Sequence, residues 1–179
     1  MSNELQAWLD AESAQRQRLS RGPGVGALPL EQATSRSGLE MMQAMLAGTV
    51  PYASIGQTLD FLLIEVAHGR AVFQGTPGPG HLNPMGSVHG GWYATLLDSA
   101  LGCCVHSALP AGKGYTTLEL KVNLIRAIRP ETVRVRAIGQ VIHVGGQTAT
   151  ADARLVGPDG KLYAHGSTTC LVFEAKART

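Results

Sequence analysis

The spacing of hydrophobic positions changes near residue 55 and divides the chain into two parts. Before that point the spacing is helical, and a Gly- and Pro-rich linker separates two predicted helices. The second helix follows Ser37, which forms a capping-box pattern with Glu40, and Gly48 ends it. The first helix is predicted from the apolar positions Leu5, Trp8, Leu9 and Leu19. We expect residues 1–55 to form a helical arm that covers a sheet edge or a subunit contact.

From Gln57 onward, hydrophobic and polar residues alternate with the period of β-strands. Two strands are predicted before a long helical segment and are broken at Gly69, although the first is apolar enough for a helix as well. Four strands follow that segment, separated by turn sequences such as "GPDG". We expect these four to form an antiparallel meander. The six predicted strands are 57–69, 70–78, 116–125, 132–144, 147–156 and 161–173.

The strand predicted at 116–125 has one apolar and one polar face. The apolar face is predicted to carry Leu118, Leu120, Val122 and Leu124. The polar face is predicted to carry Thr117, Glu119, Lys121 and Asn123. The polar face is the one that could carry function.

The segment Gly90–Ser107 predicts the long helix of the domain, about 25 Å in length. Its apolar residues cover every side, so the helix must be buried, and the sheet is the partner available to it. Ala100 and Gly102 would allow close approach of the strands. We therefore predict an α+β fold in which an antiparallel sheet wraps around one central helix.

Composition agrees with one folded domain and an appended arm. The chain has 179 residues, of which 44% are hydrophobic and 16% charged, a balance typical of globular proteins. We place the domain at residues 56–174 and the arm with its linker at residues 1–55. Cys103, Cys104 and Cys170 lack the spacing of a disulfide framework or a zinc site and are expected to be small buried residues.

Charge and hydropathy argue against two classes of partner. The net charge is +2 without a Lys/Arg cluster, which does not favour nucleic-acid binding. No apolar run reaches the roughly 18 residues of a membrane span. The stretch "MSNELQAWLDAESAQRQRL" is acidic and polar where a signal peptide is basic and then apolar, so a cytoplasmic location is expected.

Asp98 is the residue that needs an explanation, because an ionised carboxylate in a buried helix costs several kcal/mol unless it is paired. One reading is structural, either a salt bridge to a lysine or arginine of the sheet or a partly wet helix edge. The other is catalytic. The helix start at Gly90 and Gly91 offers free N–H groups that can polarise a carbonyl oxygen, and Asp98, two turns on, can act as a base. A carbonyl holder and a base are the parts that acyl transfer to water requires.

The stretch "HLNPMGSVHGGWYATLLDSALG" contains the pattern N-x-x-G-x-x-H-G-G followed by a helix with an aspartate. It resembles the hot-dog fold acyl-CoA thioesterases of the phenylacetate-pathway type. The similarity continues through "TTLELKVNLIRAIRP" and the closing strands, from about Gln57 to Phe173. The resemblance implies hydrolysis of an acyl-CoA to a free acid and coenzyme A. Coenzyme A is then part of the substrate, and no separate cofactor is expected.

The resemblance also implies a role for each matched residue. Asp98 would be nucleophile or base, the Gly90 N–H would stabilise the oxyanion, and Asn83 and His89 would orient the thioester. A serine or threonine at the start of the third strand would hold the water, which is Thr117 or, one residue earlier, Thr116. Helix and loop from different subunits of a homodimer, or of a tetramer built from two dimers, would complete each site.

Substrate contacts are predicted less sharply. Gly91 would allow the substrate close to the backbone, and Trp92, Tyr93, Leu96 and Met85 are candidates for an aromatic or alkyl pocket. The chain reads "NLIRAIRP" where the family more often has "N-F-L-R-P", which leaves open which of Arg126 and Arg129 meets the coenzyme A phosphates. Lys113 or Lys121 could join them.

Other functions have weaker support in the sequence. The chain has no G-x-S-x-G elbow and no dinucleotide-binding spacing, and the spacing of His81, His89 and His106 does not suggest a metal site. A dehydratase or hydratase of the same fold remains an alternative, as does a non-catalytic acyl-CoA-binding protein. The aspartate eight residues beyond Gly90 favours hydrolysis. The arm has no helix-turn-helix pattern of a regulator.

Overall fold

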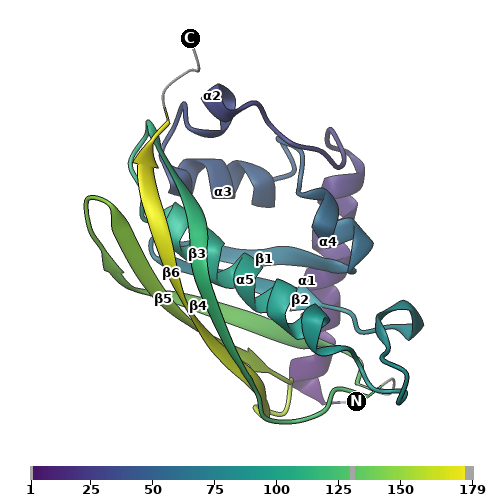
Figure 1. The fold of residues 1–179 in the computed structure, drawn as a ribbon. Helices are drawn as coiled ribbons and strands as arrows, with labels where there is room; N and C mark the ends of the chain where they lie inside the picture. Colours follow the sequence, from purple (N-terminus) through teal and green to yellow (C-terminus); the bar gives the residue numbers. More distant parts are fainter. Residues whose placement is uncertain (1, 130–131, 176–179) are drawn as a thin grey trace.

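The computed structural model describes residues 2–129 and 132–175, which form a curved sheet around one helix (Figure 1). The helices are α1 (Asn3–Ser20), α2 (Leu30–Ala33), α3 (Gly38–Leu46), α4 (Ser54–Thr58), the 3-10 turn Pro79–His81 and α5 (Gly90–Ser107). The strands are β1 (Phe61–Ala67), β2 (Arg70–Gly75), β3 (Lys113–Leu124), β4 (Val135–Val144), β5 (Thr148–Val156) and β6 (Leu162–Glu174).

The six strands form one antiparallel sheet in the order β1-β2-β4-β5-β6-β3. The sheet curls around α5, so that β1 and β3 are its two edges and the helix lies on its concave face (Figure 1). Leu96, Leu97, Ala100 and Leu101 of α5 are fully buried in the core. The predicted α+β architecture, an antiparallel sheet around one central helix, is confirmed.

Small residues allow the helix and the strands to touch. A Cβ added at Gly139 of β4 would lie 2.3 Å from the carbonyl oxygen of Ala100, and one at Gly102 would lie 2.6 Å from the hydroxyl of Tyr115. Distances this short are forbidden to a real side chain. The close approach predicted at Ala100 and Gly102 is therefore present.

The order of the strands differs from the prediction. Helix α5 has the predicted bounds, and the first strand segment is β1 rather than a helix. However, only β4, β5 and β6 form a meander, and β3 pairs with β6. The connection from β3 to β4 spans ten residues, 125–134, and crosses the sheet instead of making a tight turn. The predicted four-strand meander was wrong for this reason.

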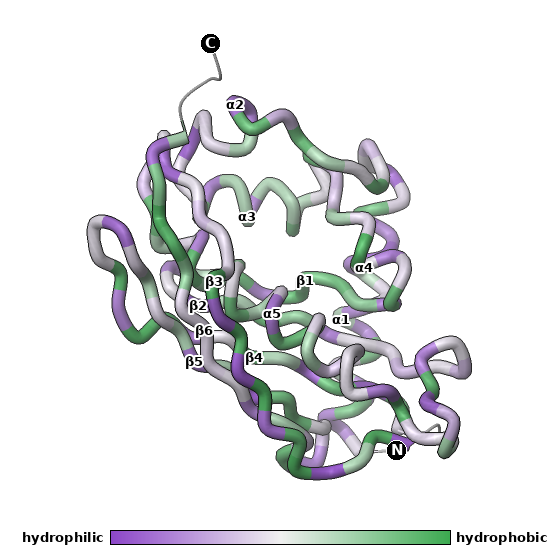
Figure 2. The backbone as a smooth tube through the Cα atoms, in the orientation of Figure 1, coloured by the Kyte–Doolittle hydropathy of each residue, from purple (hydrophilic) through white to green (hydrophobic). Residues whose placement is uncertain are grey.

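A β-bulge reverses the faces predicted for β3. The register with β6 shifts between Thr117 and Glu119. As a result Thr117 faces α5 together with Leu120 and Val122, while Leu118 is 60% exposed. The alternation seen in sequence is visible along β3 in Figure 2. Strict alternation predicted Thr117 on the polar face, away from Leu120 and Val122. That prediction is wrong because the bulge adds one residue between Thr117 and Glu119.

Helix α1 packs on the outer face of the sheet, on the side opposite α5. Its Glu12 is 4% exposed and accepts hydrogen bonds from Gln74 of β2 at 2.8 Å and from Arg134, beside β4. Arg16 also binds Glu12, at 2.8 Å. Burial would raise the pKa of the Glu12 carboxyl, but the hydrogen bonds from Arg134, Arg16 and Gln74 outweigh it and leave the pKa below its usual value. This ion cluster fastens the arm to the sheet.

Helix α3 covers the open side of α5. The predicted capping box of Ser37 and Glu40 is present, and Gly48 has φ +72° just beyond the end of the helix. A Cβ at Gly38 would lie 1.7 Å from the carbonyl oxygen of His106, so the start of α3 meets the end of α5 directly. The arm is thus packed on both faces of the domain. Because α4 crosses residues 55 and 56, the boundary stays a prediction.

The helices of the structure can be compared with what a membrane span requires. Over residues 2–129 and 132–175, no helix combines the length and the apolar character that a bilayer crossing needs.

The ion cluster predicts that Glu12→Gln destabilises the protein at neutral pH. The loss should be about 1–2 kcal/mol, because the partners Arg16 and Arg134 keep some access to water. A chain of this size would melt roughly 2–4 °C lower for each kcal/mol lost. Urea unfolding of both proteins measures the difference.

The pH dependence provides a second readout. Because the folded pKa of Glu12 is lowered, its contribution is complete above the unfolded pKa and is lost as pH falls through the folded pKa. The stabilities of wild type and Glu12→Gln should therefore converge in acid. Glu31→Gln changes an exposed carboxylate of α2 and serves as the control. Equal stability of wild type and Glu12→Gln at pH 7 would refute the role of the cluster.

Candidate active site

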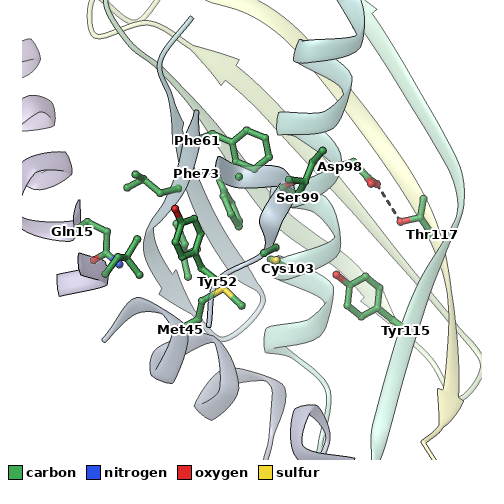
Figure 3. Close-up of a pocket in the computed structure, with 16 residues that line it drawn as sticks. Gln15, Met45, Tyr52, Phe61, Phe73, Asp98, Ser99, Cys103, Tyr115 and Thr117 are labelled. Carbon is green, nitrogen blue, oxygen red and sulfur yellow. Dashed lines mark hydrogen bonds between the residues drawn. The ribbon is translucent and has the colours of Figure 1, made fainter. Parts of the chain in front are cut away.

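A cavity of about 230 Å³ lies where the sheet leaves α5 uncovered, between the edge strands β1 and β3 (Figure 3). Its walls are largely apolar and come from three parts of the chain. The edge strands contribute Phe61, Leu62, Leu63, Tyr115 and Thr117, with Phe73 from β2. Helix α5 contributes Asp98, Ser99 and Cys103, and the N-terminal segment contributes Gln15, Leu19, Met45, Tyr52, Ala53, Ile55 and Gly56.

Asp98 lies at the polar end of this cavity and is half-buried. The hydroxyl of Thr117 donates a hydrogen bond to Asp98 Oδ1 at 3.1 Å, and Figure 3 shows the two side chains pointing toward each other. Thr116 is exposed on the other face of β3, so Thr117 is the threonine that reaches the carboxylate. Across the described residues, Asp98 forms no salt bridge. The ion-pair explanation for Asp98 therefore finds no support.

The neighbours of Asp98 are held in their neutral forms. Burial raises the pKa of the Cys103 thiol to about 12, and burial also raises the pKa of the Tyr115 hydroxyl well above its usual value. Cys103 is therefore a poor nucleophile at neutral pH, since the thiolate is the reactive form. Within the described part of the chain, no three His, Cys, Asp or Glu side chains gather as metal ligands. Asp98 is left as the basic group of the cavity.

A second hollow lies at the start of α5. It is lined by Asn83, Ser87, Gly90, Leu124 and Arg126, among others. His89 caps the helix, and its Nδ1 accepts the N–H of Gly91 at 2.9 Å. The N–H of Gly90 has no acceptor among the residues described, so it is the donor available to a ligand.

Asn83 builds the loop that leads into this hollow. Its Oδ1 accepts the N–H groups of Met85 at 2.9 Å and Ser87 at 3.2 Å, and its Nδ2 donates to the Ser87 hydroxyl at 2.9 Å. The side-chain amide of Asn83 therefore forms its hydrogen bonds within the turn between residues 83 and 87. Thioester orientation by Asn83 and His89 stays a prediction.

The two hollows do not meet within one chain. Gly90 and Asp98 are eight residues apart, or about 12 Å along the helix axis. A carbonyl group held by the Gly90 N–H would lie about 3 Å from that donor, and the water that attacks it would also have to lie within about 3 Å of Asp98. The expectation that Asp98 is near enough to a group held at the helix start of the same chain is therefore wrong, because helical rise separates them.

Other predicted substrate contacts are placed differently. Trp92 and Leu96 are buried in the core, where Trp92 Nε1 donates to the carbonyl of Leu59 at 2.8 Å. Tyr93 is buried as well and contributes to the hollow at Gly90, while Met85 is 91% exposed on its loop. None of these four side chains lines the cavity at Asp98. Trp92 serves the core because its ring faces inward and stacks on His81.

The basic candidates fall into two groups. Arg126 and Arg129 share a polar hollow with Lys161, and Arg126 also lines the hollow at Gly90. Lys113 is bound to Glu174 at 3.2 Å at the far end of β3, and Lys121 lies in a separate hollow with Asp152. The structure brings the two arginines together, and the two lysines lie apart from them.

Sequence reasoning missed several residues of the cavity. Tyr115 shares a strand face with Thr117, so strand spacing could have identified it. Ser99 and Cys103 are four residues apart and share a stripe of α5 with each other, but helical spacing from Asp98 does not point to them. The contribution of Met45, Tyr52 and other arm residues had no signal in the sequence, because long-range packing creates it.

Comparisons with known proteins show what the chain is similar to. Residues 85–164 match the model of the thioesterase superfamily. A candidate esterase of Halobacterium salinarum is 37% identical over 83 residues, which are 45% of this chain and 50% of that protein. The chain spans about half the length of the curated relatives it matches.

Two solved structures are similar in fold. A candidate thioesterase from Ralstonia eutropha, described as phenylacetic acid degradation-related, is 26% identical with a TM-score of 0.66, over 72% of this chain and 97% of that one. A hypothetical thioesterase of Streptococcus pneumoniae, solved with coenzyme A, is 23% identical with a TM-score of 0.59. The match covers 65% of this chain and 88% of that one. The resemblance to hot-dog thioesterases of the phenylacetate-pathway type is confirmed.

Proposed function

We propose that the chain, which is similar to the hot-dog thioesterases, hydrolyses an acyl-CoA thioester to a free acid and coenzyme A. One observation carries the proposal. A carboxylate without a cationic partner among the described residues, Asp98, lies with the Thr117 hydroxyl at one end of an apolar cavity. A base beside a hydroxyl that can hold water, next to room for an acyl group, suits hydrolysis.

In this mechanism Asp98 acts as the base. A water bound to the Thr117 hydroxyl gives a proton to Asp98, and its oxygen forms a bond to the thioester carbonyl carbon. The carbonyl oxygen becomes an oxyanion, which the N–H of Gly90 stabilises at the positive end of the helix dipole. The C–S bond then breaks, and the sulfur takes the proton from Asp98. Release of free thiol distinguishes this reaction from hydration of the acyl chain, which leaves the thioester intact.

A second copy of the chain would bring the two hollows together. Strand β3 runs antiparallel to α5, since Leu124 lies at Gly90 and Thr117 at Asp98. The outer edge of β3 is free among the described strands and exposes Leu118 and Leu124. If the β3 strands of two copies pair antiparallel about a twofold axis, the Thr117 end of β3 in one copy lies beside the Leu124 end of β3 in the other copy. Each site would then combine Asp98 with the partner's Gly90 N–H.

Coenzyme A would enter beside the basic hollow. Arg126 lines both that hollow and the one at Gly90, and Arg129 joins it, whereas Lys161 of the same hollow is paired with Asp159 at 2.7 Å. Phosphates favour such a group because charge-assisted hydrogen bonds are stronger than neutral ones. The solved thioesterase with coenzyme A supports this class of substrate.

The base assignment predicts the effect of Asp98→Asn. The amide keeps the shape and can still bind Thr117, but it cannot take a proton, so kcat should fall by ~10² or more. The melting temperature should change little, because no salt bridge of Asp98 is lost among the described residues. Free-thiol release and thermal melting are measured on one preparation. Asp152→Asn, on β5, is the matched charge control. Near-normal turnover by a folded Asp98→Asn protein would contradict the assignment.

The composite site predicts complementation between two inactive variants. Gly90→Pro removes the backbone N–H of residue 90, which is the proposed oxyanion donor. Proline is tolerated at the first position of a helix, and His89 already has the extended conformation (ψ 139°) that a residue before proline adopts. Loss of one oxyanion donor should lower kcat by about 10² to 10³. Mixed with Asp98→Asn, it forms heterodimers in which one site has both native groups. Activity should recover to about a quarter of wild type after random exchange of subunits.

The controls for complementation are the two variants alone at the same total concentration. Recovery after mixing requires subunit exchange, so light scattering must show at least a dimer. A fully active monomer would refute the composite site, and so would a freely exchanging mixture that stays inactive.

The basic hollow predicts a defect in substrate binding. Arg126→Ala combined with Arg129→Ala should raise KM by about tenfold or more with a smaller change in kcat, because charged hydrogen bonds are lost. The difference in KM between the double variant and the wild type should become smaller as salt is added, because salt ions screen the contacts between the wild-type arginines and the phosphates. Lys121→Ala is the control, as it removes a positive charge from a different hollow. An unchanged KM in the double variant would exclude this route for coenzyme A.

A further inference from the structure

The N-terminal arm forms the far wall of the cavity that holds Asp98. Six of the sixteen lining residues belong to residues 1–55, namely Gln15, Leu19, Met45, Tyr52, Ala53 and Ile55. In Figure 3, Gln15, Met45 and Tyr52 lie across the cavity from Asp98 and Thr117. The family match begins at residue 85, so this wall lies outside the matched segment.

The wall is held in place by specific contacts. Gln15 is 1% exposed, its Nε2 donates to the carbonyl of Leu46 at 2.9 Å, and its Oε1 accepts from Arg18. These bonds tie α1 to α3. Tyr52 is fixed through its backbone, since its N–H binds the carbonyl of Gly24 at 3.1 Å and its carbonyl accepts the N–H of Gly26 at 3.0 Å.

The chemistry of the lining restricts what can occupy the cavity. Both polar atoms of Gln15 already have partners in the protein, Nε2 with the Leu46 carbonyl and Oε1 with Arg18, so its amide serves mainly to hold the wall. Asp98 is the one charged side chain among the lining residues that are described, and no Lys, Arg or His faces it there. An occupant with its own carboxylate would be buried without a cationic partner and beside the like charge of Asp98, which is costly.

The size of the cavity sets a second restriction. Its volume of about 230 Å³ exceeds the ~150 Å³ apolar cavity that is known to bind benzene, and it is smaller than the ~300–1,000 Å³ of pockets for drug-sized ligands. A ring or a short alkyl chain fits this space. A long acyl chain would collide with the residues of the arm that form the far wall.

On these grounds, and resting on the proposed thioesterase function, we propose that the arm sets the acyl specificity: uncharged aromatic or short-chain acyl groups are accepted, and Met45 and Ile55 limit their length. Both residues are apolar and line the cavity from α3 and α4. The arm is then a specificity element and not only a cover for the sheet.

Acyl-CoA selectivity tests this proposal. Wild type should hydrolyse phenylacetyl- and hexanoyl-CoA with a kcat/KM at least tenfold above those for palmitoyl- and succinyl-CoA. Met45→Ala enlarges the cavity and should raise the decanoyl-to-hexanoyl ratio of kcat/KM about tenfold, the scale of one or two methylene groups in an apolar pocket. Met41→Ala is the matched control, because Met41 is buried in the same helix and does not line the cavity. The same ratio in wild type and Met45→Ala would overturn the proposal while leaving the hydrolase function intact.

A binding measurement separates this proposal from the proposed function. Toluene should raise the melting temperature of the wild type, because a ligand that binds the folded state stabilises it. Ile55→Trp should abolish that shift by filling the cavity, and the fold should tolerate it since Ile55 is 44% exposed. If no acyl-CoA is hydrolysed, the hydrolase function fails, and the toluene result alone decides whether the arm walls an apolar site. Equal shifts in wild type and Ile55→Trp would overturn it.

Discussion

The burial of α5 is the constraint on which the rest of the structure depends. A helix that is apolar on nearly every side must be enclosed, and six strands curl around it to do so. The enclosure remains incomplete because β1 and β3 are edges and do not pair with each other. The uncovered stripe carries Asp98, Ser99 and Cys103, and α3 and α4 close over it. The position of the carboxylate therefore follows from where the sheet stops.

The parts of the fold that could be predicted from sequence are those that local periodicity determines. The bounds of α5 followed from its apolar pattern, and the capping box at Ser37 followed from two residues three apart. Pairing of β3 with β6 could not be predicted, since it depends on a ten-residue crossing and not on a turn. The bulge after Thr117 was equally hidden, because alternation in sequence assumes that every residue of a strand takes its turn on each face.

The candidate site shows the same division. The motif from Asn83 to Gly91 identified a helix start with a free N–H, and Asp98 was recognised from its cost in an apolar helix. The resemblance pointed to Thr117 or Thr116 as the residue that holds the water, and Thr117 is the one that bonds to Asp98, although its predicted strand face was wrong. The roles of these groups stay predictions. The distance along the helix was the decisive physical quantity, because about 12 Å of helical rise separates the Gly90 N–H from Asp98 within one chain.

The fastening of α1 has a consequence for the order in which the molecule is assembled during synthesis. Glu12 lies 122 residues before Arg134, its partner at the edge of β4. The N-terminal helix therefore leaves the ribosome long before the surface that holds it exists, and contacts this remote in sequence form slowly. The Glu12–Arg134 ion pair can therefore form only after the chain as far as β4 has been made. The bonds of Gln15 with Leu46 and of Glu12 with Gln74 join residues much closer in sequence, so the fastening of α1 is completed in stages, and its last ion pair waits for the second half of the chain.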